Sequence, residues 1–249
     1  MSSLIIGASG RLGRRLTPLL DDVLTPNRAQ LDALCVRSVR AFFKSRSVSR
    51  CVMLAASTNV SRCERDASYA SETSHMAANV AVVCREHDVP LLYVSTDYVT
   101  PALRLPKQPL NEYAAHKLIA EAITRASGGQ IARVSFSTPE QMQNWVAVNA
   151  YSVSNRCWVE ELAPVLARYI QRGNWASVAA FCAPETTVAK LLRGRDPTHP
   201  ALATEWNTPH EMEAFCGFSA PKDTRFRGVC HDEMIDVPVI ASLRSHSGG

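Results

Sequence analysis

A tyrosine and a lysine stand four residues apart in "NEYAAHKLIAEAI", residues 111–123. Residues at this spacing share one face of a helix, so Tyr113 and Lys117 would lie side by side in any helical segment. A phenol next to an ammonium can act as an acid catalyst with a positioning partner, although such a pair is also ordinary on a helix surface. The rest of the chain has to decide between these two interpretations.

A hydroxyl at the end of a predicted strand supports the catalytic interpretation. The apolar stretch "PLLYVSTDYV", residues 90–99, ends in Ser95, Thr96 and Asp97. In open parallel sheets ligands gather beyond the carboxyl ends of the strands, so Thr96 is expected to point into a site. With Tyr113 and Lys117 it would supply a hydrogen-bond donor, an acid and the partner of that acid.

Glycines in "LIIGASGRLGRRL", residues 4–16, predict a dinucleotide cofactor. An apolar strand runs into Gly7, Gly10 and Gly13, and a helix is expected to follow. Glycines at these positions let the backbone turn sharply and approach a pyrophosphate at the start of the helix. The residues expected to bind the cofactor here are Gly7, Ser9, Gly10, Arg11, Leu12 and Gly13.

The end of the second predicted strand, "VLTPNRAQLD" at residues 23–32, bears on the choice of cofactor. An NAD site usually offers an acidic residue there to hold the adenine ribose. Asn27 and Arg28 occupy this place, which favours a 2′-phosphate and hence NADP, with NAD as the alternative. Asp32 follows four residues later and could instead face the adenine.

The elements that would position these groups alternate between short aliphatic strands and longer helical patterns. This alternation predicts an α/β fold with a parallel sheet. Strands are predicted at 4–6, 23–25, 51–56, 90–96, 131–136 and 177–182. Helices are predicted at 11–20, 30–46, 67–87, 111–126, 139–149, 159–172, 185–193 and 208–216.

Composition narrows the class of protein. The chain has 249 residues, 46% of them apolar, and a net charge of +4, which gives little support for a nucleic-acid or membrane partner. No apolar run approaches the roughly 18 residues of a membrane span, so a soluble cytoplasmic protein is expected. The eight cysteines form no C-x-x-C pair and are predicted to be reduced. "CHDE" at 230–233 is the one dense candidate for metal ligands, and no metal is predicted.

Three motifs in this order resemble an extended short-chain dehydrogenase/reductase: Gly7-x-x-Gly10-x-x-Gly13, "STDYV" at 95–99 and Tyr113-x-x-x-Lys117. The stretches "LAASTNV" at 54–60 and "PLNEYAAHKLIAE" at 109–121 are similar, more narrowly, to the dTDP-4-dehydrorhamnose reductase group. The resemblance is densest over residues 1–136. It implies a Rossmann-type doubly wound parallel sheet with a small C-terminal substrate-binding lobe. Residues 1–136 would form the NAD(P)-binding domain, and residues 137–249 would complete the sheet and form the lobe.

The resemblance implies an NADP-dependent reductase of a nucleotide-linked 4-keto-6-deoxy sugar. Hydride would pass from the nicotinamide to a substrate carbonyl, and Tyr113 would give the proton. Lys117 would lower the pKa of Tyr113, ordinarily about 10, and hold the nicotinamide ribose, while Thr96 would bond the carbonyl oxygen. By the same resemblance, Asp97 and Tyr98 would lie near the substrate. Ala55, Ala56 and Ser57 would line the cofactor.

Departures from the family pattern keep other functions open. The stretch "TPALRL" replaces the aromatic and glycine residues expected after "STDYV", Ala114 replaces a glycine, and Thr73 stands near a usual asparagine. The alternatives are therefore a non-catalytic NADP-binding regulatory subunit of the same fold and a sugar-nucleotide epimerase or dehydratase. The protein could also reduce another small carbonyl substrate. A homodimer is compatible with the sequence, although no motif supports one.

Overall fold

A central parallel sheet organises the part of the chain that the structure describes. In this computed structural model that part comprises residues 2–99, 111–143, 148–149, 153–154, 156–181, 183 and 186–206. The sheet has six strands in the order β10-β5-β4-β3-β1-β2, and all neighbouring strands run parallel. They are β1 (Ser2–Ile6), β2 (Val23–Leu24), β3 (Val48–Met53), β4 (Leu91–Thr96), β5 (Gln130–Val134) and β10 (Val178–Phe181). The order reverses between β1 and β3, where open sheets of this kind bind ligands.

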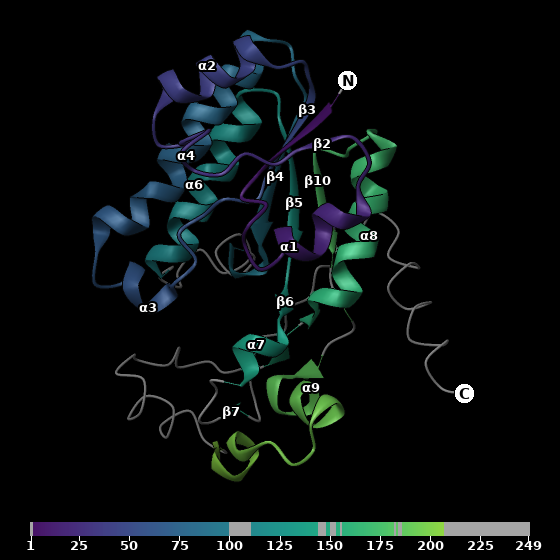
Figure 1. Cartoon of the computed structure of the whole chain (residues 1–249). Coiled ribbons are helices and arrows are strands. Elements are labelled where there is room, and N and C mark those ends of the chain that lie inside the picture. Colours follow the sequence, from purple (N-terminus) through teal and green to yellow (C-terminus); the bar gives the residue numbers. More distant parts are fainter. Residues whose placement is uncertain are drawn as a thin grey trace.

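Helices cover both faces of the sheet (Figure 1). Helices α2 (Val36–Ser45), α4 (Ala67–Glu86) and α6 (Glu112–Ala126) lie on one face, and α1 (Gly13–Leu16) and α8 (Val159–Arg172) lie on the other. Each face of the sheet has its own apolar core, and successive residues of a strand point to opposite faces. In β1, Leu4 and Ile6 pack in the core on the side of α2, α4 and α6, whereas Ile5 packs in the core on the side of α1 and α8. The predicted α/β, Rossmann-type doubly wound sheet is confirmed.

Side-chain caps fix where the helices beside the sheet begin. Asp66 accepts a hydrogen bond from the Tyr69 amide at the start of α4, and Asn111 accepts one from Ala114 at the start of α6. Asn59 caps the short α3 (Val60–Cys63) in the same way. The cap at Asn111 puts Tyr113 in the first turn of α6, just beyond the carboxyl end of the sheet. The short 3-10 helices η1 (Thr17–Leu19) and η2 (Asp97–Val99) follow α1 and β4.

The chain beyond β5 forms a second group of elements around a small core of its own. Its apolar residues are Met142, Ala189, Leu192 and Ala201. Figure 1 shows α7 and α9 beyond the end of the sheet marked by β6, whereas α8 returns to cover the sheet. The elements are β6 (Phe136–Ser137), α7 (Pro139–Met142), β7 (Val148–Asn149), β8 (Val153–Ser154), β9 (Cys157–Trp158), β11 (Thr186–Thr187), α9 (Val188–Arg195), η3 (Pro200–Thr204) and β12 (Glu205–Trp206). Strand β6 pairs with β9, β7 with β12, and β8 with β11.

All six predicted strands are found, with shifted ends. The strand predicted over 51–56 begins at Val48 and ends at Met53, and the one predicted over 131–136 ends at Val134, after which β6 starts at Phe136. The apolar residues that follow Met53 had suggested a longer strand. Residues 54–59 instead have no regular secondary structure, although the Leu54 and Ala55 amides still donate to the Ile6 carbonyl of β1 at 2.8 and 3.1 Å.

Two helix predictions are wrong in part. The helix predicted over 30–46 begins only at Val36, because Asn27 and Gln30 exchange backbone-to-side-chain hydrogen bonds and hold a turn there. The helix predicted over 139–149 ends at Met142, and residues 148–149 pair in a strand. Helix α3 was not predicted. The helix predicted over 208–216 and the "CHDE" segment lie outside the described residues.

No helix in the described part of the chain combines the length and the apolar character needed to cross a bilayer.

Candidate active site

The glycine turn after β1 leaves no room for side chains. Gly7 has φ of +92°, and a Cβ on it would lie 2.6 Å from the Ala55 nitrogen. A Cβ on Gly13 would lie 2.4 Å from the Ala8 oxygen. The Gly10 amide closes the turn by donating to the Gly7 carbonyl at 3.0 Å. Because only glycine fits at Gly7 and Gly13, the backbone itself forms this wall of the site.

A cavity of about 520 Å³ opens at the carboxyl ends of the strands, next to this turn. Its volume is within the usual range for pockets that bind small molecules and cofactors. The structure brings almost all the predicted site residues to this one cavity. Those that line it are Gly7, Ser9, Gly10, Arg11, Leu12, Gly13, Arg28, Asp32, Ala55, Ala56, Ser57, Thr96, Asp97, Tyr98, Tyr113 and Lys117.

Asn27 is the one predicted site residue that does not line the cavity. Its side chain accepts a hydrogen bond from the Gln30 amide at 3.0 Å, so it is used in the turn after β2. Arg28, by contrast, lines the cavity, and its Nε lies 3.6 Å from Asp32 Oδ1. The side chain of Arg28 is 72% exposed, so the ion pair with Asp32 leaves it accessible to a ligand.

Tyr113 is protonated in this environment. Burial raises the pKa of its phenol to about 12, and nearby Tyr98 and Asp97 add to the rise. A side-chain interaction with Thr96 and the charge of Arg11 act in the opposite direction. A proton-donating group next to the strand-end hydroxyl of Thr96 is the arrangement of an acid catalyst.

Lys117 lies one helical turn after Tyr113 on α6 and is buried. Its residue is 4% exposed, its Nζ donates to the Val94 carbonyl at 2.9 Å, and it lies 4.6 Å from the centre of the Tyr93 ring. Burial lowers the pKa of Lys117 to about 7, and the charge of Glu121 opposes this effect. The hydrogen bond to the Val94 carbonyl holds the ammonium against β4.

Asp97 lies at the same end of β4. It accepts a hydrogen bond from the Thr96 hydroxyl at 3.3 Å. Burial raises the pKa of this carboxyl group, while Ser135, Arg156 and Thr96 counteract the rise. Asp97 therefore orients the hydroxyl of Thr96 toward itself in this structure, at the wall of the cavity.

Several lining residues were not predicted from the sequence. Ser135 and Phe136 directly follow β5, so the same rule that pointed to Thr96 could have found them. Tyr69, Glu72 and Met76 come from α4, and Gln141 and Arg156 come from the chain beyond β5. For Gln141 and Arg156 the sequence contains no signal, because their place depends on how distant segments pack.

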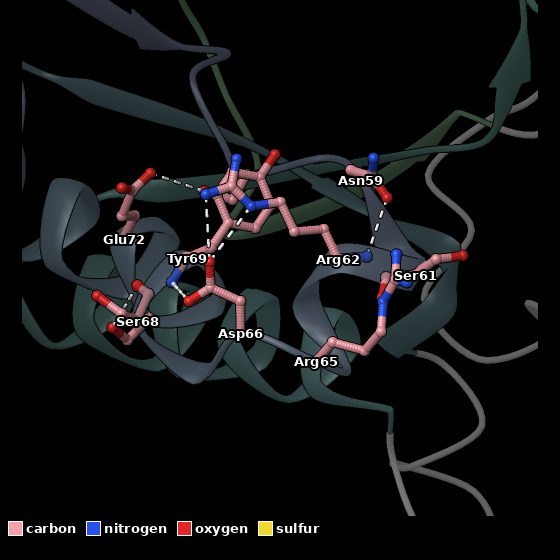
Figure 2. Close-up of polar contacts among 10 residues, drawn as sticks. Asn59, Ser61, Arg62, Arg65, Asp66, Ser68, Tyr69 and Glu72 are labelled. Carbon is pink, nitrogen blue, oxygen red and sulfur yellow. Dashed lines mark hydrogen bonds and ion pairs between the residues drawn. The ribbon is translucent and has the colours of Figure 1, made fainter.

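Polar contacts join α3 and α4 beside the cavity (Figure 2). The Arg62 guanidinium lies 4.1 Å from the centre of the Tyr69 ring and pairs with Asp66 at 3.2 Å. Glu72 accepts a hydrogen bond from the Ser57 hydroxyl at 3.1 Å. Thr73 accepts one from the Ser57 amide at 2.9 Å, so this threonine fixes the backbone that follows β3.

Within the part of the chain that the structure describes, no three His, Cys, Asp or Glu side chains gather closely enough to hold a metal ion.

Comparison of the sequence with known proteins gives two kinds of match. The family model described as the RmlD substrate binding domain matches residues 1–170. A dTDP-4-dehydrorhamnose reductase from Streptomyces griseus is 37% identical over 103 residues, which are 39% of this chain. The matched stretch spans 34% of that relative, about a third of its length.

Solved structures share the fold. A dTDP-4-dehydrorhamnose reductase from Bacillus anthracis, in complex with NADP, has a TM-score of 0.68 at 21% identity, over 78% of this chain and 80% of that one. A UDP-glucose 4-epimerase from Thermus thermophilus, in complex with NAD, has a TM-score of 0.62 at 16% identity, over 77% and 81%. At these identities the structures establish the architecture alone. The family is established by the model match over residues 1–170, and this chain belongs to the RmlD substrate binding domain family.

Proposed function

We propose that this protein is an NADP-dependent reductase of a nucleotide-linked 4-keto-6-deoxy sugar, similar to a dTDP-4-dehydrorhamnose reductase, in which Tyr113 supplies the proton. The observation that carries this proposal is the convergence of Tyr113, Thr96 and the glycine turn on one cavity. Reduction of a carbonyl needs a hydride at the carbon and a proton at the oxygen, so a cofactor site must adjoin an acid. In this proposal the glycine turn provides the cofactor site and Tyr113 provides the acid.

The roles of the polar groups follow from their protonation and position. Tyr113 keeps its proton at neutral pH because its pKa is about 12, so it is ready to donate. Its high pKa also makes it a weak acid, and a neighbouring cation would help it to release the proton. Lys117, one helical turn away, supplies this cation when it is protonated. Thr96 donates to the substrate oxygen in place of Asp97 as negative charge develops there.

The cofactor site is assigned from the turn and from the end of β2. The backbone at Gly7 and Gly13 can approach a pyrophosphate because any side chain there would collide with its neighbours. Arg28 would hold the 2′-phosphate of NADP, Asp32 lies beside it, and residues 55–57 would line the cofactor. When bound, the nicotinamide supplies the hydride. The Bacillus anthracis structure, which is in complex with NADP, supports this assignment.

The substrate site is assigned to the part of the cavity lined by Asp97, Tyr98 and residues of the chain beyond β5. Gln141 and Arg156 reach the cavity from that part of the chain. This shared lining supports a division into a cofactor-binding domain, residues 1–136, and a following region, residues 137–249, that completes the sheet and forms a small substrate lobe. The guanidinium of Arg156 and the amide of Gln141 are suited to an oxygen-rich, anionic ligand such as a nucleotide-sugar.

The function is tested by following NADPH absorbance with a panel of nucleotide-linked 4-keto-6-deoxyhexoses. Wild-type protein is expected to oxidise NADPH with at least one of them, and Tyr113→Phe is expected to lose almost all of this activity. Tyr93→Phe is a matched control, because it removes a tyrosine hydroxyl that lies outside the cavity and has no hydrogen-bond partner in the described structure. This control is expected to retain turnover.

The same assay separates the alternative functions. An epimerase would interconvert sugar nucleotides with catalytic NAD and without net NADPH consumption. A regulatory subunit would bind NADPH tightly and consume none with any substrate of the panel. Either result would overturn the reductase proposal.

A further inference from the structure

A buried ion pair lies on the side of Lys117 away from the cavity. Arg133 of β5 donates to both carboxylate oxygens of Glu121 in α6, at 3.0 Å and 2.7 Å. The side chains are 11% and 3% exposed, respectively, and neither residue lines the cavity. The fork-shaped contact fixes the position of the carboxylate inside the protein.

Glu121 follows Lys117 by one helical turn on α6. This spacing places the two side chains on one helix face, and both residues are buried, at 2% and 4% exposure. Tyr93 of β4 joins them, because the Lys117 ammonium lies 4.6 Å from the centre of its ring and the charge of Glu121 contributes to raising its pKa. Glu121 is therefore a buried carboxylate, fixed by Arg133, one helical turn from the ammonium that borders the cavity.

A purely structural role would be to tie α6 to the sheet. Buried ion pairs contribute little net stability, however, because the loss of hydration offsets most of the attraction, and an apolar pair can fill the same space. Burial also works against the charged form of Lys117, so a cation at this position needs a nearby anion. Glu121 meets that need at a buried site that the solvent does not screen.

We propose that Glu121, held by Arg133, is a positioning residue whose negative charge keeps Lys117 protonated and so sets the pH range in which Lys117 can assist Tyr113. The assistance to Tyr113 rests on the proposed function, since it concerns the proton that Tyr113 donates. The effect of Glu121 on the charge of Lys117 does not depend on that function and can be measured without turnover.

Other titratable groups surround α6, and the test has to separate them from Glu121. Of the elements packed on this helix, β4 contributes the Tyr93 ring that touches the ammonium. His116 on α6 itself bonds Ser74 of α4 through its Nδ1. Further titratable groups on the neighbouring elements are Asp97 and Tyr98 of η2, Cys63 of α3, Glu64 beyond it and Glu72 of α4. All of these remain in place when only Glu121 is changed.

The direct test is an NMR titration of the cofactor-free protein carrying ¹³C-labelled lysine. The Lys117 signal is identified as the one that disappears in Lys117→Arg. In the wild type it is expected to titrate near pH 7. In Glu121→Gln it is expected to titrate about one pH unit lower or more, because a nearby opposite charge has been removed. Glu121→Asp, which keeps the charge, is expected to restore most of the difference.

A second variant addresses loss of folding. Glu121→Gln leaves the Arg133 guanidinium buried without its anion, which costs stability, whereas Glu121→Gln/Arg133→Met removes both charges. The double variant is expected to fold and still to titrate Lys117 at the lower pH. A folded double variant with the wild-type titration would overturn the inference and leave a structural ion pair.

Kinetics then connects the charge to the reaction. In Glu121→Gln the pH above which kcat/KM declines is expected to fall by the same amount as the Lys117 titration. A shifted titration with an unchanged kcat/KM profile would contradict the link to Tyr113. If the wild-type protein shows no turnover at all, the proposed function fails, while the NMR result still decides whether Glu121 controls the charge of Lys117.

Discussion

The ring of Tyr98 meets the ring of Tyr113 edge to face, with centroids 5.8 Å apart and planes at 86°. Both residues line the cavity, and Tyr98 is 38% exposed. Aromatic pairs of this geometry contribute about 0.5–1.5 kcal/mol beyond the area they bury. The contact therefore helps to hold the ring of Tyr113 in place.

Removing this ring should impair catalysis. Tyr98→Ala is expected to lower kcat/KM by about tenfold, the equivalent of the lost aromatic contact. Tyr98→Phe keeps the ring and is expected to stay within a few-fold of the wild type. Steady-state kinetics of both variants checks this, and equal losses in the two would mean that the Tyr98 hydroxyl, rather than its ring, matters.

Lys117 should reduce the stability of the cofactor-free protein. Its pKa is about 7 when folded and about 10.4 when unfolded, so between these values the unfolded chain binds more protons. The stability cost is present in full below pH 7 and disappears as the pH rises toward 10. Lys117→Met is therefore expected to be inactive and yet more stable than the wild type, most clearly at pH 7.

Denaturant unfolding of both proteins at pH 7 and pH 9 measures this. The difference in the free energy of unfolding should shrink as the pH rises, because the other titrating groups are common to both proteins. A difference that is independent of pH would show that the charge of Lys117 is not the cause.

Arg28 should discriminate between the two nicotinamide cofactors. Arg28→Ala is expected to raise the KM for NADPH by tenfold or more, on the order of a charge-assisted hydrogen bond, and to leave the KM for NADH nearly unchanged. Asn27→Ala is the matched neighbour, since the Asn27 side chain bonds Gln30 and does not line the cavity. Steady-state kinetics with each cofactor measures both KM values. An equal rise of the KM for NADPH and for NADH in Arg28→Ala would contradict the assignment.

The glycine turn should not tolerate even one methyl group. A Cβ on Gly13 would lie 2.4 Å from the Ala8 oxygen, so Gly13→Ala is expected to lose about 1–3 kcal/mol of stability and to weaken NADPH binding. Gly194 in α9 has open space around it, so Gly194→Ala is expected to stabilise the protein by up to about 1 kcal/mol. Thermal unfolding and a fluorescence titration with NADPH compare the two, and unchanged NADPH binding by Gly13→Ala would contradict the role of the turn.

The sequence predicts those parts of the site that local rules control. Gly7 and Gly13 could be placed because a tight turn after a strand admits no side chain, and Thr96 because parallel strands end at one edge of the sheet. Tyr113 and Lys117 share a helix face at any i, i+4 spacing. These groups come together because the parallel sheet fixes where each strand ends.

What the sequence does not predict depends on packing across distant segments. The i, i+4 spacing cannot indicate that Lys117 would bond Val94 and lie on the ring of Tyr93, because these contacts come from another strand. Arg156 likewise reaches the cavity only through the pairing of β9 with β6. The helix expected over 139–149 shows the same limit, since residues 148–149 pair with β12 far along the chain.

In the proposed reaction, hydride reaches a sugar carbonyl in this cavity while Tyr113 supplies the proton. A single-turnover reaction of the protein with NADPH deuterated at the transferring position and a nucleotide-linked 4-keto-6-deoxyhexose, followed by mass spectrometry of the product, tests this directly. One deuterium is expected on the reduced carbon with the wild type, and no labelled product is expected with Tyr113→Phe. Labelled product formed equally well by Tyr113→Phe, or no label from wild-type protein that binds NADPH, would contradict it.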